Sequence, residues 1–219
     1  MRGQYTYDLL KYNDIPLNNV EVVGCPSILL KPIDTDGIKE KFNKLNNKSN
    51  DEIKCGINFP NYYQYRKLYY SFRNIMSDTD VFTLVVDGFD WYNFVNNGKK
   101  LMIIDADKLE KNKDNLKFSN NVFKLMDFFA DKTDFMFGTR IHGTILGLCA
   151  GLPSMCIAID SRTYELCEQM NIPYINCINK PIDFKNKNEL IEIFKNSFDV
   201  SKLDLLKKTI HNNKNLYNI

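Results

Sequence analysis

Short apolar runs alternate with longer stretches of mixed residues through most of this chain. The runs are rich in β-branched residues and commonly end at Gly, Pro, Asp or Asn, which predicts buried strands. The longer stretches repeat apolar residues three or four positions apart, which predicts amphipathic helices. Alternating strands and helices are typical of an α/β domain with a largely parallel sheet, and we expect a Rossmann-like, doubly wound fold.

The predicted elements cover most of the sequence. The strands are expected at 20–23, 53–59, 81–86, 101–104, 134–137, 154–159 and 174–177. The helices are expected at 5–12, 64–76, 122–130, 141–150, 162–170, 189–197 and 202–215. Two Lys- and Asn-rich stretches, 39–54 and 108–121, are interpreted as solvated loops or helix surfaces. We expect a single Rossmann-like domain over residues 1–219, with an N-terminal arm and helix at 1–19 and a C-terminal helix at 200–219.

Several polar residues follow predicted strands, and in doubly wound sheets ligands bind beyond the carboxyl ends of the strands. These residues are Asn58, Asp87, Asp105, Thr139 with Arg140, and Asp160 with Ser161 and Arg162. They could share one crevice. The glycine-rich dinucleotide fingerprint and the phosphate-binding loop that ends in Gly-Lys-Ser/Thr are both absent, which disfavours a nicotinamide enzyme or a nucleotide triphosphatase.

The most informative segment is FGTRIHGTILGLCAGLP at 137–153, where a buried strand leads into an apolar helix. A helix start offers unpaired N–H groups and a positive dipole, so it favours a bound anion. Arg140 adds a forked donor, and His142 adds a group that can change protonation near neutral pH. Gly143 lets a ligand approach the backbone. Alternatively, His142 only caps or packs in the first helical turn.

A second junction has the sequence Asp160-Ser161-Arg162-Thr163, and should lie beside the first. Asp160 or Ser161 would serve as an ordinary N-cap whatever the function. Arg162 is a cation in a first helical turn, where it opposes the macrodipole. It therefore serves either a bound anion or a surface salt bridge.

Two further segments carry candidate chemistry. Asp87-Gly88-Phe89-Asp90-Trp91-Tyr92 places carboxylates beside aromatic faces, which suits carbohydrate, although an acidic turn that shields core aromatics fits equally well. Arg2 lies in an N-terminal arm, and such chain ends are commonly disordered.

Composition narrows the class of protein. Hydrophobic residues make up 44%, charged residues 26%, and the net charge is +2, with acids and bases well mixed. These values are ordinary for a globular protein and indicate no nucleic-acid partner. The six cysteines lack the paired spacing of zinc sites, so we expect buried free thiols and no metal. No segment is long and apolar enough to cross a bilayer, and we expect a cytoplasmic location.

The segment from Phe137 to Pro153 resembles the signature segment of the polysaccharide pyruvyl transferase family. Residues 160–163 with Glu165-Leu166 and Ile172-Pro173-Tyr174 resemble the stretch after that signature in one branch of the family. The opening Arg2-Gly3-Gln4-Tyr5-Thr6 and Val22-Val23-Gly24-Cys25-Pro26-Ser27 resemble segments that begin the family's second half. The resemblance thus spans nearly the whole chain.

This resemblance implies one half of a GT-B-like architecture and the transfer of a pyruvyl group from phosphoenolpyruvate to a sugar as a ketal. It implies that Arg140 and His142 bind the donor and take part in catalysis, with His142 as the general acid, and that Arg2 contacts the donor. Arg162 stands where many members carry a lysine. The scheme implies no cofactor besides the donor substrate.

Family members are usually longer, with an additional N-terminal domain that helps to hold the acceptor sugar. A second copy of the chain or a partner chain could then complete the acceptor side. Two other functions stay open: a noncatalytic donor-binding subunit, and a GT-B-type glycosyltransferase that uses nucleotide sugars.

Overall fold

The computed structural model describes residues 3–58, 66–84 and 113–217, and its centre is a parallel sheet. The described part of the sheet has six strands in the order β3-β2-β1-β4-β5-β6. They are β1 (Cys55–Asn58), β2 (Val81–Leu84), β3 (Leu116–Lys117), β4 (Phe135–Gly138), β5 (Ser154–Ala158) and β6 (Tyr174–Asn176). Every neighbouring pair is parallel, so the predicted Rossmann-like fold is confirmed. The strand order reverses between β1 and β4, which is the switch point of such a sheet.

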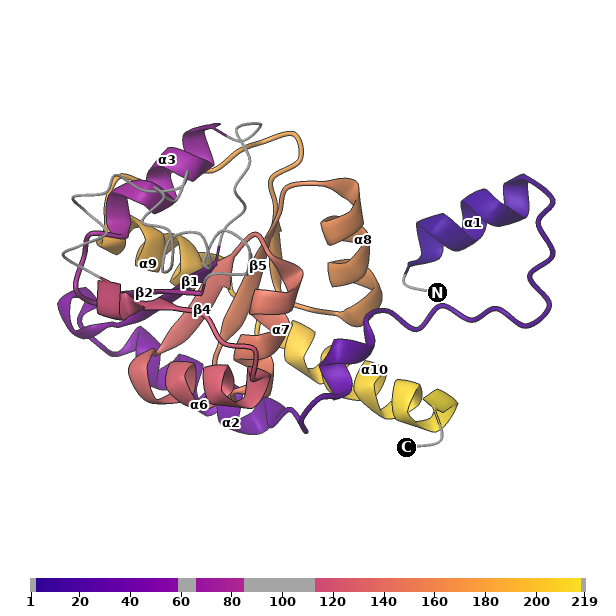
Figure 1. The fold of residues 1–219 in the computed structure, drawn as a ribbon, viewed down its shortest axis with the longest axis horizontal. Helices are drawn as coiled ribbons and strands as arrows, with labels where there is room; N and C mark the ends of the chain where they lie inside the picture. The colour runs from indigo at the N-terminus through magenta and orange to yellow at the C-terminus, as the bar shows by residue number, and fades with distance from the viewer. Residues whose placement is uncertain (1–2, 59–65, 85–112, 218–219) are drawn as a thin grey trace.

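Helices surround this sheet (Figure 1). They are α1 (Gln4–Tyr12), α2 (Thr35–Asn46), α3 (Arg66–Ile75), α6 (Val122–Lys132), α7 (Ile141–Cys149), α8 (Ser161–Met170), α9 (Lys187–Ser197) and α10 (Ser201–Tyr217). Short 3-10 turns form η1 (Pro26–Leu29), η2 (Asn50–Glu52) and η4 (Lys113–Asn115). Most predicted helices and strands that fall in the described ranges are therefore confirmed, with boundaries that shift by one or two residues.

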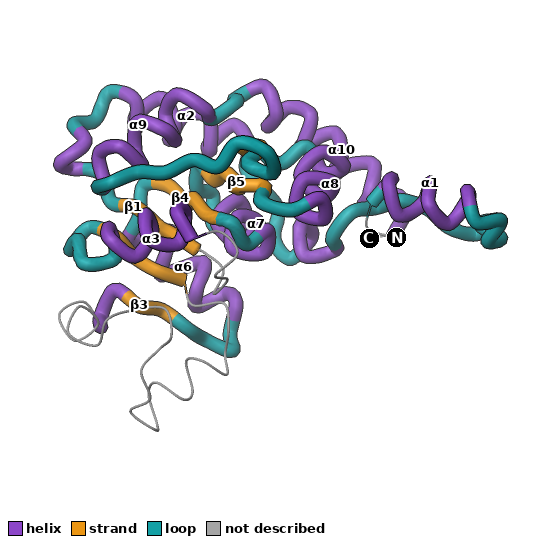
Figure 2. The backbone as a smooth tube through the Cα atoms, turned by 90° about the horizontal axis from the view of Figure 1, so that it is seen from above, coloured by secondary structure: helices purple, strands orange, loops and turns teal. Residues whose placement is uncertain are grey.

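The two faces of β4 show how the layers pack, because successive side chains of a strand point in opposite directions. Phe135 stacks on Phe194 of α9 with ring centroids 4.1 Å apart, so α9 covers one face. On the other face α7 comes close to Met136, since a Cβ atom added at Gly147 would lie 2.9 Å from the Cβ of Met136. Figure 2 shows α2 and α9 on one side of the strands and α6 and α7 on the other.

Helix α1 stands away from the sheet and reaches the rest of the molecule through α8 (Figures 1 and 2). The N–H of Thr6 donates to Oε1 of Glu165 at 3.1 Å, so a carboxylate of α8 lies at the positive end of α1. None of the α1 residues is buried, and Tyr12 is 85% exposed. The N-terminal arm is thus held mainly by its first turn.

The prediction of a strand at 20–23 is wrong. The backbone there is not part of the sheet, and its carbonyl groups accept hydrogen bonds from side chains instead. The amide of Gln169 on α8 donates to the carbonyl of Val22 at 3.4 Å, and the amide of Asn213 on α10 donates to that of Val23 at 2.8 Å. These helix side chains take the place of a neighbouring strand, so an apolar, β-branched segment lies outside the sheet.

One helix and one strand were not predicted, and several predictions cannot be compared. Helix α2 begins before the stretch 39–54, which was interpreted as solvated loops or helix surfaces, and continues into it; Asp34 caps its start, and Ile38, Phe42 and Leu45 bury one face. Strand β3 is only two residues long. The predicted strand at 101–104 and the candidates Asp87 and Asp105 lie outside the described residues, as does Arg2.

Candidate functional site

Asn58 ends β1 at the switch point and holds the start of the segment that follows β4. It is paired in register with Gly138 and is fully buried. Its carbonyl accepts the N–H of Thr139 at 2.9 Å, and its side-chain Oδ1 accepts the N–H of Arg140 at 2.8 Å. One residue of β1 therefore fixes the backbone of two predicted site residues.

Two glycines make this arrangement compact. A Cβ atom at Gly138 would overlap the carbonyl of Asn58, and a Cβ atom at Gly143 would lie 2.5 Å from its Cγ. Both positions therefore require glycine for close approach. Gly143 thus brings the first turn of α7 against the end of β1, which places the helix start at the switch point.

Arg140 is the N-cap residue of α7 and is half-buried. Its carbonyl accepts the N–H groups of Gly143 at 2.9 Å and Thr144 at 3.2 Å, which closes the first turn. The sequence predicted this strand-to-helix junction, and the structure confirms it. The first N–H groups of a helix have no partner within the helix, and the expectation of an anion at the start of α7 depends on this general property.

Three buried polar atoms lie at the same junction. Nδ2 of Asn58 and the hydroxyls of Thr139 and Thr144 form no hydrogen bond within the described parts of the chain. All three side chains are at most 3% exposed. Buried donors without partners are costly, and they commonly mark places where a ligand, water or ion completes the bonding.

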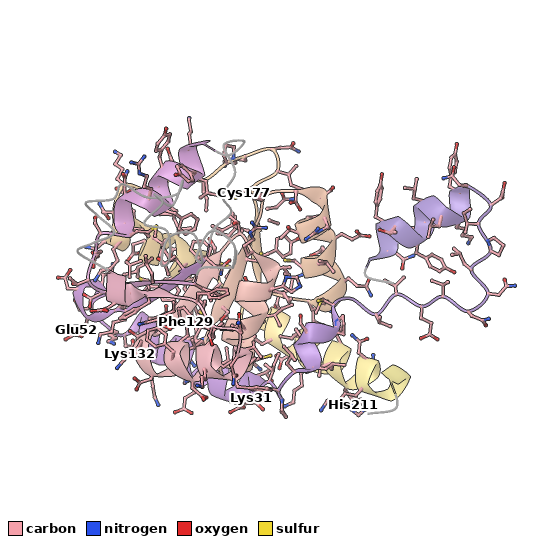
Figure 3. All side chains as sticks on the ribbon, in the orientation of Figure 1. Lys31, Glu52, Phe129, Lys132, Cys177 and His211 are labelled. Carbon is pink, nitrogen blue, oxygen red and sulfur yellow. The ribbon has the colours of Figure 1, made fainter. Side chains whose placement is uncertain are left out.

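His142 lies in the first turn of α7 with an exposed side chain. Its Nε2 is 3.6 Å from Sγ of Cys25, which lies 117 residues earlier in the chain. The other histidine, His211, lies on α10 near the C-terminal end of the chain (Figure 3). Of the two histidines, His142 is the one at the switch-point junction.

Cys25 directly precedes η1, and its thiol is close to two polar groups. Its hydrogen bond with His142 lowers the pKa of Cys25 from 9.0 to about 6, against the opposing effect of burial and with help from Ser27, whose Oγ is 3.0 Å from Sγ. All six cysteines are free and buried, as predicted. Burial raises the pKa of Cys55, Cys149 and Cys177, so Cys25 differs from them in its surroundings.

The second predicted junction lies beside the first, because β4 and β5 pair in parallel. The carboxylate of Asp160 accepts the N–H of Thr163 at 2.7 Å, so Asp160 is the N-cap of α8. Asp160, Ser161 and Arg162 are all exposed. Arg162 forms no ion pair with the described acidic residues, and the salt-bridge interpretation gains no support from them.

A pocket of about 250 Å³ borders His142 and Gly143. Apolar side chains form most of its wall, among them Leu30, which directly follows η1, Leu125 of α6 and Leu146 of α7. Ser161 lines a separate hollow between α1 and α8. The structure therefore brings His142 and Gly143 to one pocket and leaves Ser161 in another.

Sequence reasoning missed the part that Cys25 and Ser27 play beside His142. Locally, Gly24, Cys25 and Pro26 end an apolar run, as many loops do, and the family resemblance of residues 22–27 assigned no role to Cys25. A contact across 117 residues has no counterpart in local periodicity. The contact between Cys25 and His142 forms only when the segment around η1 packs against α7 in the folded chain.

The reversal of strand order between β1 and β4 defines a Rossmann-like protein. At this switch point α7 starts with Arg140 and His142, and two closely packed glycines, Gly138 and Gly143, bring the helix start against β1. The family model described as polysaccharide pyruvyl transferase matches residues 1–161 of the 219. The chain therefore belongs to the polysaccharide pyruvyl transferase family, and membership indicates that activity in general. Arg162 lies one residue beyond the match.

Comparison with curated proteins gave no match, and comparison with solved structures gave none. Among the described residues, no helix combines the length and apolar character that a bilayer span requires.

Proposed function

We propose that this protein transfers the pyruvyl group of phosphoenolpyruvate to a sugar of a glycan or glycan precursor and forms a ketal. The family match supports a pyruvyl transferase in general. The observation that carries the choice of donor is the junction of β4 and α7, where Arg140 caps a helix start at the switch point and His142 lies in the first helical turn. The domain would correspond to one half of a GT-B-like architecture.

The donor suits this junction chemically. Phosphoenolpyruvate carries a carboxylate and a phosphate on a three-carbon skeleton, so a helix start and a forked arginine can hold both groups. We assign donor contacts to Arg140, Thr139 and Gly143. We assign further contacts with the substrates to Arg2, Asp87, Ser161 and Arg162. Asp160 contributes through its cap of α8, which fixes the neighbouring turn.

In the proposed reaction His142 is the general acid. A proton from His142 bonds to the methylene carbon through the electron pair of the double bond, while a sugar hydroxyl oxygen bonds to the adjacent carbon and its proton returns to the imidazole. A second hydroxyl of the sugar then displaces phosphate from the same carbon. The released phosphate carries away both electrons of the broken bond, and the second hydroxyl proton goes with it.

The test is incubation of the protein with phosphoenolpyruvate and a panel of hexose and amino-sugar acceptors. We expect release of inorganic phosphate and an acceptor mass raised by one pyruvyl ketal. His142→Gln should lower the rate by about 10²- to 10⁴-fold, the usual contribution of a general acid. Arg140→Ala should mainly weaken donor binding.

His211→Gln provides the matched control, since His211 is exposed on α10. It should retain the wild-type rate. Donor binding without turnover would instead favour a noncatalytic donor-binding subunit. The absence of both binding and turnover would refute the proposed function.

A further inference from the structure

Cys25 is held in place by contacts from several elements. Gly24 turns the chain with φ of +74°, and the N–H of Cys25 donates to Sδ of Met170 on α8 at 3.1 Å. Just before this turn, Asn213 of α10 binds the carbonyl of Val23. The carbonyl of Cys25 accepts the N–H of Ile28, which starts η1. These contacts fix the backbone, so the position of Sγ beside His142 is a built feature of the fold.

A positive charge on His142 would be stabilised by a nearby anion. His142 lies in the first turn of α7, and a helix start disfavours a positive charge. An imidazolium at this place therefore benefits from a counter-charge within hydrogen-bond reach. Sγ of Cys25, at 3.6 Å from Nε2, occupies that position.

The groups that face the thiol favour its ionised form. They are the imidazole of His142 on α7 and the hydroxyl of Ser27 on η1, both able to donate to Sγ. Met170 on α8 accepts the backbone N–H of Cys25, and Asn213 on α10 donates to the backbone carbonyl of Val23. Cys25 is 3% exposed, so its thiol is shielded from water, whereas the imidazole of His142 is exposed. The lowered pKa of Cys25, about 6, agrees with this geometry.

We propose that Cys25 and His142 form a thiolate–imidazolium pair, in which Cys25 is a positioning residue that keeps His142 charged as the proton donor. The inference rests on the proposed function for the step that the proton serves. The pair itself is a property of the folded protein without substrate.

The thiolate–imidazolium pair also determines which proton of His142 is transferred. An imidazolium carries one proton on each nitrogen, so the proton on Nε2 donates to the thiolate and the proton on Nδ1 is the one transferred. It passes to the methylene carbon of the donor, and the proton of the attacking hydroxyl restores the imidazolium. The thiolate keeps its electrons and forms no covalent bond in the cycle.

The first experiment measures thiolate absorbance near 240 nm against pH in the full chain, with Cys25→Ser as the reference. We expect the wild-type difference signal to rise at a pH near 6, because the pKa of Cys25 is lowered. In His142→Gln the signal should move toward pH 9.0, since the largest cause of the lowering is gone. Cys149→Ser is the matched control, and should leave the signal unchanged because the pKa of Cys149 is raised. If the thiolate signal of His142→Gln rises at the same pH as that of the wild type, Cys25 and His142 do not form the pair.

The second experiment measures rates of Cys25→Ser with phosphoenolpyruvate. Serine keeps the size and a hydrogen bond but does not ionise, so we expect kcat to fall by about tenfold or more, KM for the donor to stay within about twofold, and the alkaline limb of the rate profile to move to lower pH. A wild-type kcat and an unshifted limb would refute the role of Cys25. A wild-type protein without turnover would refute the proposed function alone, and the thiolate titration would still decide whether the pair exists.

Discussion

Replacing Asn58 by alanine should loosen the junction that carries the proposed donor site. Asn58 is fully buried, and its Oδ1 accepts the N–H of Arg140 at 2.8 Å. In Asn58→Ala the backbone bond from Thr139 remains, because it uses the carbonyl of residue 58. The substitution therefore removes one defined contact, and leaves the N–H of Arg140 without its acceptor.

The size of the effect depends on this lost contact. A buried donor left without its acceptor costs about 1–3 kcal/mol, and we take about 2 kcal/mol for the loss of free energy of unfolding. In a chain of this length that corresponds to a fall in Tm of roughly 4–8 °C. The same loosening lets the start of α7 move, so phosphoenolpyruvate should bind about tenfold more weakly, or about 1.4 kcal/mol less favourably.

Urea denaturation followed by circular dichroism measures the stability, and calorimetry measures donor binding. Asn115→Ala is the matched control, because its amide donates to the carbonyl of Thr79 at 2.8 Å in an exposed setting. We expect this control to lose less than about 1 kcal/mol and to bind the donor normally. If Asn58→Ala is as stable as the control and binds the donor like the wild type, Asn58 does not hold the junction.

Three further changes probe neighbouring parts of the molecule. Gly143→Ala should destabilise the protein by about 1–3 kcal/mol in urea denaturation, because the new Cβ would lie 2.5 Å from Asn58 Cγ; an unchanged midpoint would contradict the close packing. Asp160→Ala should cost about 1 kcal/mol and Asp160→Asn distinctly less, since asparagine also caps helices; equal losses would mean that the carboxylate charge matters more than the cap. The Tyr174 hydroxyl and the Lys202 ammonium lower the pKa of Glu168 from its usual 4.5, so ionised Glu168 stabilises the fold above that pH and the stabilisation is lost as the pH falls through the lowered value. The Tm of the wild type should therefore differ from that of Glu168→Gln at neutral pH, and this difference should disappear at acid pH. A difference that persists at low pH would refute this assignment.

The sequence predicted most described elements because their burial is local and periodic. The apolar run before Gly138 and the apolar helix after Arg140 each bury nearly every residue, so pattern alone located the junction. The strand wrongly expected at 20–23 has the same apolar, β-branched character. Its carbonyl groups pair with Gln169 and Asn213, which lie far away in sequence, and no local pattern shows that.

The sequence located only part of this junction, for the same reason. Arg140 and His142 can be recognised as candidates from the local sequence, because they lie at a predicted helix start where an anion is expected. Cys25 becomes a candidate only through its long-range contact with His142. Asn58 was expected merely as a polar strand end, and its support of Arg140 depends on the pairing of β1 with β4. The functional roles assigned to Arg140 and His142 stay predictions, as do those assigned to Arg2, Asp87 and Arg162.

Calorimetry with the wild-type protein and Arg140→Ala would decide which donor binds at the β4–α7 junction. The ligands are phosphoenolpyruvate and a set of nucleotide sugars. We predict that phosphoenolpyruvate binds the wild type, binds Arg140→Ala at least about tenfold more weakly, and that the nucleotide sugars do not compete. Binding of a nucleotide sugar with no binding of phosphoenolpyruvate would contradict the proposed donor and the assignment of the β4–α7 junction as its site.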